Sequence, residues 1–421
     1  MGARYTVASA LLAALLTQAA IAADVPTTPQ EADEQFSHAM SLRESGEVGE
    51  SIRLLQAVQA KQPKDRVKLE LAVAYYRALN FSKARSLAEE VLNQPSTPES
   101  VKVTIRQFLT QIEADSKPST FTPFVSFGYV TDSNVNAGPS RSTLDIGGTS
   151  FTLGSGSVQN GDSGLNAMVG VNHRYLFDRP LTVAGTELAA MWQSQAAYYT
   201  MSYDNKKAYD LDVVSLSTGP VLISADNWRV SVPYQVSDIY LGHSRLATFQ
   251  SLNPTVLWRL GNWELSADGQ YQDKTFISPQ NAGRNSDVSS EGIAVGRTYQ
   301  GGRYGFAVTA RAFNEVATDI RFSNKGDDYG VILTARPWDG WDFAFRHNYR
   351  STNYNGVEPL YNVARREHEE RSSLGANYAF RGGVMDSWTL GLITTVTRNH
   401  SNVSIYDYSR IQTGLTLGRS F

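Results

Sequence analysis

The sequence predicts an α + β membrane protein, with a short tetratricopeptide-like helical domain followed by a 14-stranded antiparallel transmembrane β-barrel. Two observations predict this division. Only 3 of the 33 glycines lie before residue 121, and all seven tryptophans lie after it. The spacing of apolar residues also changes near residue 118, from a helical period to strict alternation. The expected parts are therefore a signal peptide at residues 1–22, a helical domain at 23–117 and a barrel at 118–421.

Residues 1–22 have the pattern of a cleavable secretory signal. Arg4 supplies the positive charge, residues 5–16 form a short apolar run, and the small residues Ala20 and Ala22 precede the expected cleavage point. The run is too short to span a bilayer, and no later segment approaches the ~18–20 apolar residues of a transmembrane helix. The alternative for this segment is an uncleaved membrane anchor. We expect a mature chain that begins at Ala23 and leaves the cytoplasm.

Residues 31–116 contain five amphipathic helix patterns. The clearest place one apolar stripe per helix over residues 84–92 and 101–112. The small residues Ser51 and Ala84 lie 33 positions apart, close to the 34-residue period of tetratricopeptide repeats. The pattern favours two helical hairpins capped by a last helix. The alternative is a helical domain without a binding groove.

From residue 121 onward, apolar and polar residues alternate, as in strands with one apolar and one polar face. The alternation is clear over residues 165–172, 263–272 and 341–350. In a transmembrane barrel the apolar face meets lipid and the polar face lines the lumen. Long loops are expected at 131–163, 197–207, 241–247, 275–286, 318–327, 352–366 and 399–404, in strict alternation with six short turns. The resulting even number of strands predicts that the first and the last residue of the barrel both lie on the periplasmic side. The helical domain, which precedes the first strand, is then periplasmic too.

Aromatic residues support the barrel independently. Six of the seven tryptophans lie within three residues of an expected short turn, as in the aromatic girdle of a membrane interface: Trp228, Trp258, Trp263, Trp338, Trp341 and Trp388. The final alternating strand ends at Phe421, which resembles the terminal assembly signal of outer-membrane barrels. The localisation expected from these features is the bacterial outer membrane.

The composition points away from several classes of function. Lys and Arg number 38 against 41 Asp and Glu, so no basic surface for nucleic acid is expected, and the absence of cysteine excludes thiolate chemistry. No metal-ligand spacing, phosphate loop or nucleophile elbow is present, so we expect no catalytic residue, no cofactor and no metal. Charges of both signs are expected to face the lumen, at Glu264, Asp268, Arg311, Arg346 and Arg350. A set of Ser, His and Asp residues converging from different strands is the remaining enzymatic alternative.

The order of signal, short helical repeats and fourteen-stranded barrel is similar to the surface lipoprotein assembly modulator (Slam) family. The first barrel strand, at residues 123–129, precedes a stretch that carries Asp132, Asn134 and Asn136, and the two together resemble the first strand and loop of that family. The resemblance implies a type XI secretion translocon that moves lipidated or soluble proteins from the periplasm to the cell surface. Cargoes of relatives bind metals, haem or host proteins.

The partners implied are a secreted protein or surface lipoprotein as cargo, a periplasmic chaperone, the barrel-assembly machinery and outer-membrane lipid. Two other functions fit the same architecture. Polysaccharide exporters also join tetratricopeptide repeats to barrels, although they usually have more repeats and a larger barrel. A passive porin with a structural helical appendage is the third interpretation.

Overall fold

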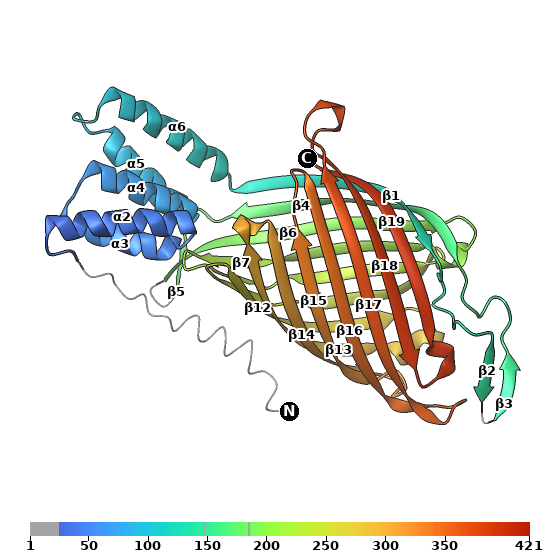
Figure 1. The fold of residues 1–421 in the computed structure, drawn as a ribbon. Helices are drawn as coiled ribbons and strands as arrows, with labels where there is room; N and C mark the ends of the chain where they lie inside the picture. Colours follow the sequence, from blue (N-terminus) through green and yellow to red (C-terminus); the bar gives the residue numbers. More distant parts are fainter. Residues whose placement is uncertain (1–24, 147, 184–185) are drawn as a thin grey trace.

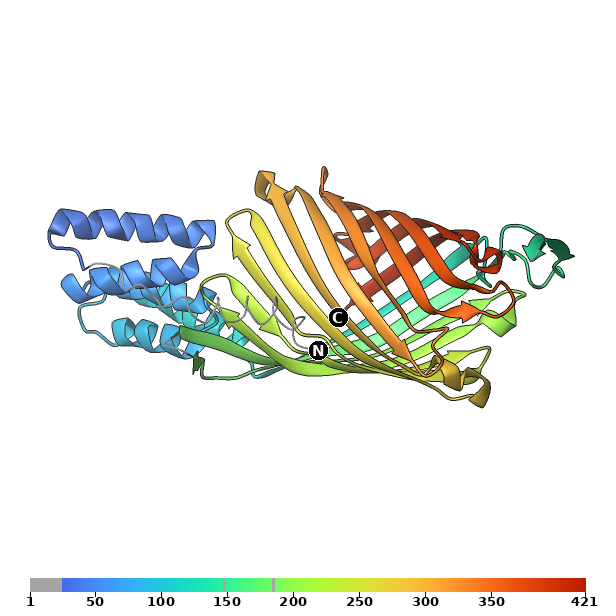
Figure 2. The ribbon, with the colours of Figure 1, turned by 90° about the horizontal axis from the view of Figure 1, so that it is seen from below.

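The computed structural model describes residues 25–146, 148–183 and 186–421. This part of the chain is an N-terminal helical region followed by a 14-stranded antiparallel β-barrel, which confirms the predicted fold class. The helices lie together beyond one end of the barrel, as Figures 1 and 2 show. The expected secretory signal at residues 1–22 lies outside the described residues.

The helical region packs through small residues where its helices touch. Ala39 and Ser51 are fully buried, and the Ser51 hydroxyl donates a 2.7 Å hydrogen bond to the carbonyl oxygen of Ala39. Ala84 is buried to the same extent. Each helix contacts the next one along the chain. The helices described are α2 (Pro29–Ser45), α3 (Val48–Lys61), α4 (Asp65–Arg77), α5 (Phe81–Leu92) and α6 (Glu99–Asp115).

The barrel closes because its first strand pairs with both its second and its last strand. Pro233 and Pro254, which lack a backbone donor, each lie at a break within a barrel strand. β8 with β9 and β10 with β11 are thus the two parts of single strands. The fourteen strands are β1 (Ser119–Asp132), β4 (Asp162–Leu176), β6 (Thr186–Tyr203), β7 (Leu211–Ser224), β8 (Trp228–Ser231) with β9 (Tyr234–Leu241), β10 (Ser244–Leu252) with β11 (Thr255–Leu260), β12 (Trp263–Phe276), β13 (Ser286–Tyr299), β14 (Tyr304–Ala317), β15 (Asn324–Ala335), β16 (Trp341–Glu358), β17 (Val363–Ala379), β18 (Trp388–Ser401) and β19 (Tyr408–Ser420).

Three short strands lie outside this ring. β5 (Leu181–Val183) pairs with the start of β6. β2 (Thr143–Ile146) and β3 (Thr149–Thr152) pair with each other, and in Figure 1 their hairpin projects from the end of the barrel that is opposite the helices. We call this the loop-side end, and the end next to the helices the turn-side end.

The outer face of the barrel is apolar and its inner face is polar. In β15, Tyr329, Val331 and Leu333 are 54%, 39% and 46% exposed, whereas Asp328 and Gly330, at alternate positions, face the lumen. A closed sheet leaves no unpaired backbone edge, which is what lipid requires of a membrane-spanning structure. The chain is therefore an outer-membrane β-barrel. Among the described residues, no helix has the length and apolarity needed to cross a membrane.

The expected strict alternation of long loops and short turns is wrong. β9 and β10 are joined by the two-residue turn Gly242-His243, both with positive φ, where a loop over 241–247 was expected. β16 and β17 extend to a connection at 359–362 only, inside the loop expected at 352–366. The turn-side connection at 380–387 is longer than either. Strand pairing continues beyond the lipid, where side chains are polar, so composition marks the end of the membrane span and not the end of the strand.

The tryptophans near the turn-side end gather as expected. Trp228 and Trp258 face each other in register, and the Trp341 ring stacks on Phe343 with centroids 5.5 Å apart. Trp338 lies against the same Phe343 ring at 6.0 Å. Amphipathic indole rings in one zone fit the level of the lipid headgroups. This zone therefore marks one membrane interface.

Candidate functional site

The helical region is docked on one sector of the turn-side end. The N–H of Gly49, in the first turn of α3, donates a 2.9 Å hydrogen bond to the carbonyl oxygen of Ala225, in the turn between β7 and β8. The approach is so close that a Cβ on Gly49 would lie 2.0 Å from a carboxylate oxygen of Asp226. Arg53, one helical turn further on, forms a 2.8 Å ion pair with the same Asp226.

A second ionic contact lies beside the first. Lys83 of α5 forms a 2.6 Å ion pair with Glu187 of β6, and the Asn80 amide donates a 3.0 Å hydrogen bond to the same carboxylate. Burial opposes the charge on Lys83, but its contacts with Glu187 and Tyr75 outweigh burial and raise its pKa. Because α3 and α5 each contact the barrel at a different point, the helical region has a defined orientation.

Apolar contacts make the docking continuous with the lumen. Leu176, Met191 and Val221 are buried lumen-facing residues at the turn-side ends of β4, β6 and β7. They belong to the same apolar cluster as Leu55 and Tyr75 of the helices. The core of the helical region therefore extends into the mouth of the barrel. The ion pairs and apolar contacts between the described helices and the barrel lie in the β4–β7 sector and its turns, whereas β12–β17 lie on another sector of the ring.

The predicted lumen charges Asp268 and Arg311 meet across a glycine. They lie on β12 and β14, face Gly292 of the intervening β13 from both sides, and form an ion pair over it. A Cβ at Gly292 would lie 2.8 Å from Asp268 and 2.9 Å from Arg311. The glycine therefore leaves room for a pair that crosses three strands.

The ladder of charges continues around the wall. Arg350 of β16 forms a 2.9 Å ion pair with Asp328 of β15, and Lys274 of β12 forms a 3.0 Å pair with Glu315 of β14. Near the turn-side end, Glu264 pairs with Arg259 at 3.0 Å. Four of the five predicted lumen charges thus have a partner of opposite sign.

Arg346 is the exception. Its position on β16 places it on the same face as Arg350, it is exposed, and no ion pair to it is recorded among the described residues. Its register neighbours Ile332 and Ser373 are uncharged. Arg346 therefore presents an uncompensated positive charge to the lumen.

Asp132 closes the barrel at the loop-side end of the β1–β19 seam. Its side chain is fully buried, and its two oxygens share the N–H of Arg410 Nε, at 3.0 and 3.1 Å. Arg410 Nη2 donates a further hydrogen bond, and Gln412 donates one of 3.0 Å. The Tyr203 hydroxyl donates a further bond of 3.1 Å, and the backbone N–H of Asn134 one of 2.9 Å. The carboxylate thus joins the first and last strands and β6.

Asn134 and Asn136 hold the loop that follows. The Asn134 amide donates 2.9 Å hydrogen bonds to the carbonyl oxygens of Gly138 and Ser409, and Gly138 N–H returns a bond to it. Asn136 accepts from the backbone N–H of Asn160, at the other end of the loop, and donates to the Val158 carbonyl oxygen. The structure thus brings the three motif residues together, and their hydrogen bonds stabilise the β1–β19 seam and the loop that follows β1.

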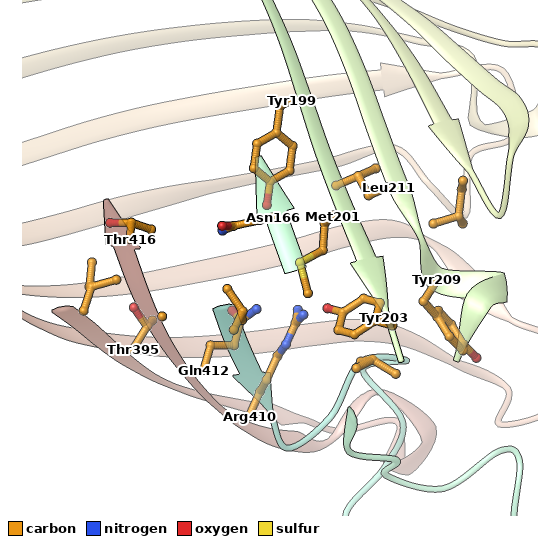
Figure 3. A pocket seen from close by; sticks show the side chains of 15 residues that line it. Asn166, Tyr199, Met201, Tyr203, Tyr209, Leu211, Thr395, Arg410, Gln412 and Thr416 are labelled. Carbon is orange, nitrogen blue, oxygen red and sulfur yellow. The ribbon is translucent and has the colours of Figure 1, made fainter. Parts of the chain in front are cut away.

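Beside the hydrogen bonds of Asp132 lies a lumen cavity of about 390 Å³ (Figure 3). Tyr199, Tyr203 and Tyr209 supply aromatic rings, while Asn166 and Gln412 supply amides. The only charged lining residue is Arg410, which Asp132 neutralises. An aromatic and amide lining without net charge suits neutral, amphipathic groups. The tyrosines were not identified from the sequence, because their convergence depends on how neighbouring strands are registered.

Phe421 follows β19 at the turn-side end. Its ring is exposed, its N–H donates a 2.9 Å hydrogen bond to the carbonyl oxygen of Pro123, and the Arg419 guanidinium lies 4.9 Å from the ring centroid. The backbone bond extends the closing pair of strands to the last residue. The role of Phe421 as an assembly signal stays a prediction.

Within the described ranges, no group of three or more His, Cys, Asp or Glu side chains is placed to hold a metal ion. His368 stacks on Tyr349, with centroids 5.9 Å apart, and His347 contacts the Ser372 hydroxyl at 2.9 Å. In these contacts each histidine has a partner on the adjacent strand of the β16–β17 pair.

No protein-family model matches the chain, and no curated protein matches it. Among solved structures, OccAB4 of Acinetobacter baumannii is similar with a TM-score of 0.34 and 10% identity, over 72% of this chain and 99% of that one. A bacterial polysaccharide outer membrane secretin gives 0.38 and 9%, over 71% and 98%. OmpT of Vibrio cholerae lacking loop L8 gives 0.39 and 12%, over 72% and 100%. At these identities and scores the likenesses do not bear on function.

Proposed function

We propose that this protein is an outer-membrane translocon, which moves polypeptides from the periplasm through its barrel to the cell surface. The observation that carries the proposal is the docking of the helical region, whose apolar core continues into the lumen at Met191 and Val221. Repeated helices usually present a protein-binding surface. A binding surface docked at one sector of a pore mouth is suited to delivering cargo into that pore.

The lumen wall also suits an extended polypeptide. Within each of the ion pairs Asp268–Arg311 and Asp328–Arg350 the opposite charges neutralise each other, so these pairs retain cargo of neither sign. A 14-stranded barrel lies between small barrels filled by side chains and the open channels of 16 or more strands. Such a lumen admits an extended chain and excludes a folded domain. A periplasmic chaperone would keep the cargo unfolded, and the barrel-assembly machinery would assist insertion.

Transport by purified protein tests the proposal. We expect a lipoprotein or secreted protein encoded beside this gene to become protease-sensitive on the far side of liposomes that contain the full chain and a periplasmic chaperone. Liposomes with an unrelated barrel are the control. Permeation of small sugars without any transfer of polypeptide would contradict the proposal and favour a passive porin.

The proposed orientation places the helices in the periplasm, and cysteine labelling tests it directly. Because the chain contains no cysteine, single variants carry a single thiol. We expect Ser157→Cys, in the loop after β1, to react with an impermeant maleimide on intact cells, and Asn262→Cys, in a turn-side connection, to react only after permeabilisation. The reverse pattern would overturn the orientation.

The tyrosine-lined cavity favours a second candidate, export of a polysaccharide. Tyrosine faces can stack on sugar rings, and the amides of Asn166 and Gln412 can bond to their hydroxyls. Its test is transfer of a neutral oligosaccharide ladder across the same liposomes. Retention of long oligosaccharides, together with passage of polypeptide, would exclude this candidate.

A further inference from the structure

A second lumen cavity, of about 570 Å³, lies in the wall just inside the turn-side end. Its lumen-facing lining includes Arg174, Arg229, Asn172, Gln193, Gln195 and Ser217, from β4, β6, β7 and β8. No aspartate or glutamate is among the residues that line it. Two guanidinium groups and three amides therefore surround a space without a carboxylate.

Neither arginine is neutralised by its neighbours. The Arg229 Nη2 donates a 3.0 Å hydrogen bond to the Gln193 side-chain oxygen, and the Arg174 Nη2 one of 3.4 Å to the Thr120 hydroxyl. The Nε of Arg174 is buried and has no hydrogen-bond partner. No ion pair to either residue is recorded within the described part of the chain. Both guanidinium charges are thus uncompensated by the described residues around them.

Two arginines of the opposite wall are paired with carboxylates. There Arg311 and Arg350 are each bonded to an aspartate of a nearby strand, so their charge is satisfied within the wall. Arg174 and Arg229 are bonded only to neutral oxygens. A guanidinium group that is not bonded to a carboxylate of the protein can bind a carboxylate of a ligand through two parallel hydrogen bonds.

We propose that this cavity is a binding site for carboxylate-bearing ligands, held by Arg174 and Arg229 and by the amides of Asn172 and Gln195. Two guanidinium groups within one cavity favour a ligand with at least two carboxylates. The wall around them has a low dielectric constant, which concentrates their field on the cavity.

The position of the site suggests which carboxylates it meets. Val221 lines this cavity and also belongs to the apolar cluster that joins the barrel to the helices. A segment released from the helical region into the lumen would reach this cavity at once. We therefore assign the carboxylates to acidic side chains of an exported polypeptide. This assignment of the source rests on the proposed function, whereas the carboxylate site itself does not.

Calorimetric titration of the purified full chain in detergent tests the site, with hexaglutamate, glutarate and inorganic phosphate as separate probes. We expect hexaglutamate to bind, with an affinity that falls as sodium chloride is raised. In R174Q/R229Q its dissociation constant should rise at least tenfold. The control R303Q/R381Q removes two guanidinium groups from turn-side connections outside the cavity and should leave the constant unchanged. The Arg229→Lys variant, which keeps the charge but not the fork, should fall between them.

Each outcome decides a separate point. Binding of glutarate as tight as that of hexaglutamate would support a carboxylate site but overturn the polypeptide as its source. Binding of phosphate alone, no binding of any probe, or equal losses in R174Q/R229Q and R303Q/R381Q would overturn the proposal. Because the titration requires no transport, failure of polypeptide transfer in liposomes with intact hexaglutamate binding would refute the proposed function and leave the site standing.

Discussion

Replacing Asp132 by alanine is expected to lower the free energy of unfolding of the barrel by about 3–5 kcal/mol, because it leaves a partly buried guanidinium without its partner. The variant removes the acceptor of bonds from Arg410, Gln412 and Tyr203, all at the seam between the first and last strands and β6. The measurement is the urea midpoint of heat-modifiable mobility on gels.

A matched control is the Asp319–Arg321 pair, which lies within one loop and is partly exposed. Asp319→Ala is expected to cost less than about 1 kcal/mol, as surface pairs do. The double variant D132L/R410M should be more stable than Asp132→Ala alone, because it removes the isolated charge along with the pair. Equal destabilisation by Asp132→Ala and Asp319→Ala would show that the seam does not depend on this carboxylate.

Replacing Gly49 by leucine is expected to release the helical region from the barrel. Even a Cβ at this position would lie 2.0 Å from Asp226 and 3.1 Å from the backbone of Ala225, so the turn itself would have to move. Overpacking of this kind typically costs about 1–3 kcal/mol, and here the cost falls on the docked state alone. Polypeptide transfer in liposomes should drop to the level of the barrel without residues 29–116.

The neighbouring variant Glu50→Leu places the same side chain on the exposed face of α3 and is the control. Pairs of spin labels at Glu89 and Arg381 can be introduced uniquely, since the chain has no cysteine. We expect a narrow distance distribution in the parent chain and in Glu50→Leu, and a broad one in Gly49→Leu. A broad distribution with undiminished transfer would mean that docking is not needed for export.

Local periodicity was sufficient to predict the fold class. Apolar residues follow a helical period before residue 118 and a period of two after it. These periods depend only on which residues face an apolar environment, so they can be recognised without knowing any contact. The same alternation placed Asp268, Arg311 and Arg350 on one face, and the structure pairs two of them with each other. The gathering of tryptophans near the turn-side end followed from the same pattern.

Loop lengths could not be predicted in the same way. Residues 352–366 are polar, and polarity there indicated a loop, yet backbone hydrogen bonds extend β16 to Glu358 and β17 back to Val363. Side-chain polarity reports whether a position meets lipid. It does not report whether its backbone is paired, because strands remain paired in water when a neighbour is present.

What the sequence determined alone is the order of a helical region and a closed barrel, with a lumen that carries both signs of charge. Only the tertiary structure decided which charges are neutralised. Asp132 and Arg410 are 278 residues apart and meet because the last strand returns to the first. Arg174 and Arg229 share a cavity because β4, β6, β7 and β8 are neighbours in the sheet, whereas Arg350 has an aspartate on the adjacent strand. Periodicity fixes the face on which a residue lies, whereas its partners depend on strand register and barrel closure, which are properties of the whole sheet.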